Sequence, residues 1–230
     1  MLVAIESGAA ETGDPDRPGG VVDAVAGLQQ GADAGICGHG AGPVGRLLTA
    51  VAAPDDVSAS GSAQPDGEFR AALVGELVRR YLRAVRAHAR GSGAPRVWQV
   101  VLSRWEGGAG DPARTALAGA HALVCFDLPP AVVSACTLLG RSPAPAEQAA
   151  VQAVTGQIAR LANDAAAAAA TDTGSRDDAS GLALLLSRSE CWRQAEHLWT
   201  LRGRPSEAER ERAALDWRAA LVARALLGSG

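Results

Sequence analysis

The chain has 230 residues, of which 47% are apolar, and its formal net charge is −3. This length fits one large domain or two small ones, and the apolar fraction is ample for a buried core. The acidic balance, without any basic block, argues against a nucleic-acid partner. The four cysteines form no Cys-x-x-Cys pair and the N-terminus has no signal-peptide pattern, so we expect a reduced, cytoplasmic protein.

Loop-like and helical patterns alternate over the first 67 residues. Residues 7–20 are rich in Gly, Pro and Asp, so we predict that residues 1–20 form a disordered tail. A short helix is expected at 21–30. The glycine-dense stretch at 35–43 lacks the Gly-Lys-Ser/Thr ending of a phosphate loop, so a simple loop is the better interpretation. A helix at 44–53 and a Pro/Gly/Ser linker at 54–67 follow.

Helical patterns dominate after this linker. Residues 68–90 place their large apolar side chains on one stripe, and Gly91 ends the helix. Residues 96–105 contain enough β-branched residues for a strand, but Val97 and Val101 also fit one face of a helix. We favour the helix because the sequence offers no partner strands.

The second half of the chain predicts further helices, each with a recognisable end. The double proline after Asp127 is expected to stop one of them, and Ser206 with Glu209 forms a capping-box pattern for the last. The expected ranges are 114–126, 131–139, 145–170, 177–201 and 206–227.

These patterns predict an all-α fold of seven to nine helices. We expect a single irregular or orthogonal bundle over residues 21–230, because no repeat of fixed period is present and nothing divides the chain cleanly. No apolar stretch free of helix breakers reaches about 18 residues, so neither a membrane span nor a membrane partner is expected.

One polar pair lies in the otherwise apolar segment before the double proline. His121 is expected on an apolar helix face, where a satisfied core histidine is the main alternative to a catalytic one. Asp127 would cap the next helix, but its capping partners are prolines, which have no N–H. It also falls at the negative end of the preceding helix. We therefore predict an arginine partner, Arg80 or Arg188, with a structural ion pair as the alternative to catalysis.

A second polar set falls within residues 188–199. Glu190 and His197 share one predicted helix stripe, and Trp192 lies on the opposite one. Such a polar stripe is usually a solvated face, but if it faces a cavity, Glu190 and His197 could act as an acid/base pair. The four histidines are isolated from one another, so we expect no metal and no cofactor.

Three segments together resemble an actinobacterial, all-helical family of unknown function. Arg80-Tyr81-Leu82 resembles the family's Asn-Arg-Tyr-Leu stretch. Residues 118–129 resemble its Gly-x-Asn-Ala-His-Ile-Asn-x-Asp-Leu segment, and residues 187–199 resemble its Arg-x-x-Ala-Trp-x-x-Ala-x-x-Leu segment. The resemblance covers the chain from about residue 21 to its end.

The chain departs from this family pattern at three polar positions. With Asp127 aligned, Leu123 replaces the family's His, and His121 and Cys125 replace its two Asn residues. The resemblance thus implies a divergent member that keeps Asp127, either adapted to an apolar substrate or no longer catalytic.

These observations lead to two functional hypotheses. The first is a small-molecule enzyme of secondary metabolism, cyclase- or isomerase-like, that works without a metal on an apolar molecule in an internal pocket. The second is a non-catalytic binding or scaffold protein, which could form a homodimer. For the first hypothesis the candidate catalytic residues are Asp127, His121, His197 and Glu190, and the candidate substrate-binding residues are Arg80, Tyr81, Arg188 and Trp192. A cavity beside Asp127 and His121 would favour the enzyme, and solid packing around them would favour the binding protein.

Overall fold

The computed structural model describes residues 42–53, 67–106, 111–170 and 179–228, except for the side chains of 169–170 and 179–188. Within these ranges the chain forms eight α-helices and one π-helix, and no strand. The all-α class is therefore confirmed, and the eight α-helices of the described residues fall within the expected range of seven to nine. The predicted tail, the short helix at 21–30, the glycine-dense loop up to residue 41 and the linker after residue 53 lie outside the described residues.

The first three described helices lie close to their predicted positions. They are α2 (Pro43–Ala52), α3 (Gly67–Ala89) and α4 (Arg96–Glu106). Helix α4 settles the choice between strand and helix, because its buried residues recur at helical spacing. Gly91 follows α3 with a φ of 62°, a left-handed conformation that favours glycine at a helix end.

The middle of the chain is one continuous helical run, and the prediction that the double proline stops it is wrong. Helix α5 (Pro112–Ala122) passes into the π-helix η2 (Leu123–Asp127) and then into α6 (Leu128–Leu138). Prolines inside an α-helix lack an N–H and clash with a carbonyl one turn back. The wider π-turn lies just before the prolines, where a regular α-helical turn would meet this clash, and Leu128 N–H bonds to Leu123 O.

Three long helices complete the fold. They are α7 (Pro145–Ala170), α8 (Ala179–Thr200) and α9 (Pro205–Leu227). The predicted capping box at the start of α9 is wrong: Arg204 is the N-cap residue and makes no side-chain cap bond. The helix begins one residue earlier than predicted because Pro205 occupies its first turn, a position that suits proline.

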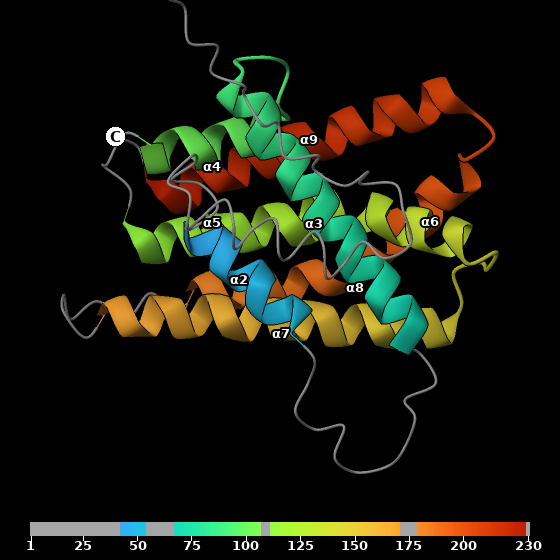
Figure 1. The fold of residues 1–230 in the computed structure, drawn as a ribbon, viewed down its shortest axis with the longest axis horizontal. Coiled ribbons are helices and arrows are strands. Elements are labelled where there is room, and N and C mark those ends of the chain that lie inside the picture. The colour runs from blue at the N-terminus through green and yellow to red at the C-terminus, as the bar shows by residue number, and fades with distance from the viewer. Residues whose placement is uncertain (1–41, 54–66, 107–110, 171–178, 229–230) are drawn as a thin grey trace, which may run out of the picture.

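The central run of α5, η2 and α6 is surrounded by the other helices (Figure 1). Helices α2, α4, α7 and α9 pack against α5, and α3 and α8 pack against α6. Helix α3 crosses the run obliquely in Figure 1. Small residues on α5 allow the neighbouring helices to pack close to its backbone. At Gly119, for example, a Cβ would overlap Val44 Cγ2 of α2.

The same run, Pro112–Leu138, is long and apolar enough to cross a membrane by length and composition. The sequence alone predicts no such stretch, because Pro129 and Pro130 are counted as helix breakers. In the structure 83% of its most apolar window is buried inside the bundle. Its apolar character is therefore accounted for by its place at the centre of the core.

Candidate functional site

Asp127 lies deep in the core and is bound by a tryptophan. Its side chain is the last of η2, and the residue is only 2% exposed. Its Oδ2 accepts a hydrogen bond of 2.8 Å from Nε1 of Trp98 on α4, which is itself fully buried. It makes no capping bond to α6, as expected from the prolines. However, it lies within a continuous helical run and not at a helix end, so the predicted opposition of a helix dipole is wrong.

Burial raises the pKa of Asp127 to about 7. The positive charge of Arg80 and the bond from Trp98 oppose this rise, and the negative charge of Asp216 adds to it. Arg80 is therefore an electrostatic partner, although the described atoms include no direct ion pair between the two side chains. The side chain of Arg188, the other predicted partner, lies outside the described residues.

Arg80 is held by neighbours other than Asp127. Its terminal nitrogen donates to Ser134 Oγ at 3.2 Å, and its Nε lies 4.0 Å from a carboxylate oxygen of Glu76. The Nε has no hydrogen-bond partner among the described atoms. Burial lowers the pKa of Arg80, an effect that Asp127 and Glu76 partly offset. The guanidinium thus contributes positive charge next to the carboxylate without binding it.

Tyr81 packs beside this pair. Its ring meets the Trp98 ring edge to face, with centroids 5.1 Å apart and an interplanar angle of 65°. Burial raises the pKa of Tyr81. The aromatic contact fixes the plane of the indole, and with it the direction of the N–H that Asp127 accepts.

His121 belongs to a different contact from Asp127. The residue is 7% exposed, and its Nδ1 lies 3.4 Å from Cys125 Sγ. Burial lowers the pKa of His121 to about 4, so the ring is neutral at pH 7, and its Nε2 has no hydrogen-bond partner among the described atoms. The structure therefore does not join His121 and Asp127 into one site. Instead, it places His121 in contact with Cys125, and these are the two residues that replace Asn in the family pattern.

The polar stripe of α8 lies away from the core. Glu190 and His197 are both exposed. Glu190 pairs with Arg193 and accepts a hydrogen bond of 2.6 Å from Gln194, the contacts expected of a solvated helix face. Trp192 is 6% exposed and packs in the core. The structure thus brings neither Glu190 nor His197 to Asp127.

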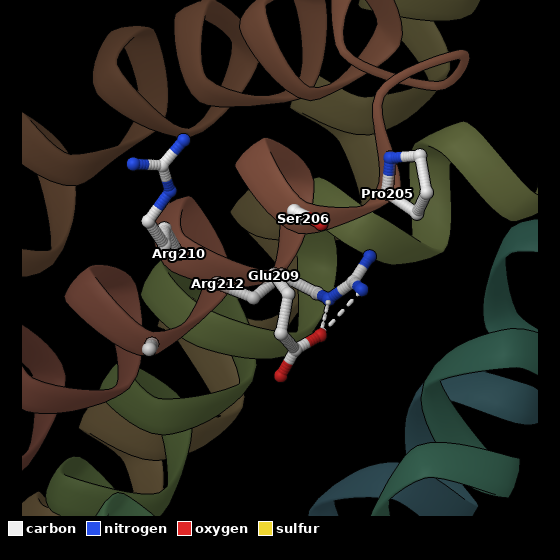
Figure 2. Close-up of a pocket in the computed structure, with 6 residues that line it drawn as sticks. Pro205, Ser206, Glu209, Arg210 and Arg212 are labelled. Carbon is white, nitrogen blue, oxygen red and sulfur yellow. Dashed lines mark hydrogen bonds and ion pairs between the residues drawn. The ribbon is translucent and has the colours of Figure 1, made fainter.

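Neither described cavity is lined by Asp127 or His121. The larger one, of about 590 Å³, is an open hollow on the surface of α9 (Figure 2). Figure 2 shows Glu209 and Arg212 paired on one side of the helix and Arg210 pointing away on another. The smaller cavity, of about 10 Å³, lies beside Tyr81 and has room for about one water molecule.

Sequence reasoning missed Trp98 as the partner of Asp127 because the two residues lie 29 positions apart. The one available signal was that a buried indole N–H needs an acceptor. Within the described part of the chain, no three or more His, Cys, Asp or Glu residues are grouped so that they could hold a metal ion.

Comparison with known proteins gives one match. No curated protein and no solved structure matches the chain. The model of a family of unknown function, DUF5995, matches residues 55–229. That span includes the continuous run, the Trp98–Asp127 bond and the α8 stripe. The chain therefore belongs to the DUF5995 family of unknown function.

Proposed function

We propose that this chain is a non-catalytic binding or scaffold protein, and that its buried polar groups serve the fold. The observation that carries the proposal is that Asp127 and His121 are both buried and that neither lines a described cavity. A small-molecule site normally encloses most of its ligand in a cavity of several hundred Å³. The larger hollow lies instead on the outside of α9.

The contacts of the polar groups also support a structural role. The Trp98–Asp127 bond ties α4 to the central run, and the His121–Cys125 contact lies within that run. The first bond satisfies a carboxyl group that would be costly to bury alone, and the second gives one ring nitrogen of His121 a partner. The remaining catalytic candidates, Glu190 and His197, are exposed to solvent. Neither has a described side-chain contact with any residue of these two pairs.

The stability of Asp127 variants tests this proposal. Active-site residues commonly cost stability, so their replacement tends to leave the fold unchanged or to stabilise it. A structural Asp127 behaves oppositely: Asp127→Asn should lower the free energy of unfolding by about 1–3 kcal/mol, measured by urea denaturation near pH 4, where the folded protein keeps Asp127 protonated. The matched control is Asp164→Asn, an exposed position on α7 that should be neutral. An Asp127→Asn variant more stable than the parent would contradict the proposal.

One observation favours a second candidate, a cyclase- or isomerase-like enzyme acting on a small apolar molecule. A carboxyl group with a pKa of about 7 suits acid/base catalysis near neutral pH, and π-helical turns are frequent at functional sites. This function requires a cavity to open beside Asp127. A thermal-shift screen of apolar cyclic and linear compounds tests it: a compound that raises the melting temperature of the parent but not of Asp127→Asn would favour the enzyme.

A further inference from the structure

The outward face of α9 exposes large apolar side chains. Trp217 is 52% exposed, Leu221 is 43% exposed and Val222 is 37% exposed. Trp217 and Leu221 are four residues apart and so lie next to each other on the helix surface. Elsewhere in the described part of the chain, Leu138 at the end of α6 is the remaining large apolar residue of comparable exposure.

Positive charge surrounds this apolar patch. Arg210, Arg218 and Arg224 are exposed on the same helix. Arg218 makes one ion pair, of 3.2 Å, with Glu211. From Trp217 to the end of α9 the sequence contains no acidic residue. The C-terminal half of the face is therefore apolar and cationic, although the whole chain has a net charge of −3.

The acidic side chains of α9 are occupied elsewhere. Glu207 pairs with Arg204, and Glu209 pairs with Arg212. Asp216 accepts two backbone N–H groups at the start of α4. Together with the Glu211–Arg218 pair, these contacts leave Arg210 and Arg224 without an acidic partner among the described residues.

The positive charge of this face favours one kind of binding partner over another. A second copy would bring the arginines of two identical faces together, and like charges in close contact oppose association. An anionic lipid surface complements both features, because tryptophan favours the membrane interface and each arginine near an anionic surface adds attraction. We propose that the outward face of α9, centred on Trp217 and Leu221, docks on the surface of an anionic membrane.

This inference names a partner for the proposed binding function and rests on it. It concerns contact with the membrane surface. The sequence alone predicts no membrane partner, because it shows no segment free of helix breakers that could span a membrane. The two proposals fail separately: the stability of Asp127→Asn tests the structural role of the core, and vesicle binding tests this face alone.

The experiment uses the full chain and vesicles of phosphatidylcholine, with or without phosphatidylglycerol, in co-sedimentation at low salt. We expect binding to the anionic vesicles, little binding to the neutral ones, and loss of binding as salt is raised. The tryptophan fluorescence should shift to shorter wavelength on binding. That shift should be absent in Trp217→Phe, because the other four tryptophans of the chain stay where they are.

Matched variants separate this face from the rest of the surface. Leu221→Ser should weaken vesicle binding, whereas Leu138→Ser, at an exposed leucine on α6, should not. The double variant Arg218→Glu with Arg224→Glu should weaken binding at least about tenfold, since each reversal replaces attraction with repulsion. Arg86→Glu, an exposed position on α3, is the charge control and should change binding far less.

Several results would overturn the inference. These are no binding to anionic vesicles at low salt, equal binding to neutral vesicles, or an unchanged affinity in the double variant. Sedimentation equilibrium adds a further one: a dimer that Trp217→Ala dissociates would assign the face to a second copy. Circular dichroism of each variant shows whether it has folded before its binding is compared.

Discussion

The indole Nε1 of Trp98 lies 2.8 Å from Oδ2 of Asp127, and this bond joins α4 to the central run within a largely apolar core. A carboxylate buried without a partner would cost several kcal/mol. Here the N–H of Trp98 and the nearby positive charge of Arg80 reduce that cost. The pKa of about 7 reduces it further, because the carboxyl group can keep its proton up to near-neutral pH. The bond therefore explains how a charged residue type is tolerated among the helices.

Trp98→Phe tests the contribution of this bond. The phenyl ring keeps most of the apolar area but removes the donor, so we expect a loss of about 1–3 kcal/mol in the free energy of unfolding. The loss should be larger at pH 8 than at pH 5, because the ionised carboxylate needs the donor more. Urea denaturation at both pH values measures it, with the exposed Trp217→Phe as control. Equal losses for the two variants would show that the bond contributes nothing specific.

Asp127 should make stability fall as pH rises. Its pKa is about 7 in the folded protein against 3.8 for the unperturbed group, so the folded state holds the proton more tightly. Its stabilising contribution is full below pH 3.8 and is lost as pH rises to about 7. His121→Asn leaves this effect unopposed, and its free energy of unfolding should decrease from pH 4 to 7, by up to about 1.4 kcal/mol per pH unit. A flat profile in this variant would contradict the raised pKa.

His121 should have the opposite effect. Its pKa is about 4 when folded against 6.5 for the unperturbed ring, so the unfolded state binds the proton more readily. Its contribution is full above pH 6.5 and is lost as pH falls to about 4. The Asp127→Asn variant should therefore lose stability on acidification over this window. In the parent the two effects oppose each other, so its profile should be flatter than that of either variant, as chemical denaturation across pH would show.

The helices of this fold could be predicted because their signal is local. The apolar stripe of α3 and the spacing of Val97 and Val101 in α4 both follow from the 3.6-residue period. The continuous run could not be predicted in the same way. Its π-turn depends on how the backbone accommodates Pro129 and Pro130, and local rules for proline predict a break instead.

The candidate site was predicted in part. Asp127 makes no capping bond to the next helix, as the sequence suggested, and Arg80 lies close enough to affect its pKa. The direct bond from Trp98 and the separate His121–Cys125 contact depend on which helix faces meet. That information lies in the packing of distant segments, which a single sequence does not reveal.

Asp216 provides another long-range contact that can be tested. Its two carboxylate oxygens each accept a backbone N–H at 2.9 Å, from Arg96 and Val97, so a residue of α9 caps the start of α4. Asp216→Ala should cost about 1 kcal/mol of stability, the usual value of an N-cap. Asp111→Ala, which removes the local cap of α5, is the matched comparison and should cost a similar amount. Thermal and urea denaturation measure both, and a neutral Asp216→Ala would show that water replaces the cap.

The close approach of α2 to α5 limits the side chain at Gly119. A Cβ built there would overlap Val44 Cγ2 and lie 3.3 Å from Val44 Cβ, so Gly119→Ala must push the two helices apart. We expect a loss of about 1–3 kcal/mol in the free energy of unfolding, although alanine is the better helix former. Gly67→Ala is the control, because nothing lies within 4 Å of its Cβ position.

A double variant tests whether the contact itself causes this loss. Val44→Ala removes the methyl groups that a Cβ at residue 119 would meet, so Gly119→Ala should cost less in the Val44→Ala background than in the parent. Urea denaturation of the four proteins gives the coupling energy. If the two losses simply add, the close packing of α2 on α5 is not what requires glycine at this position.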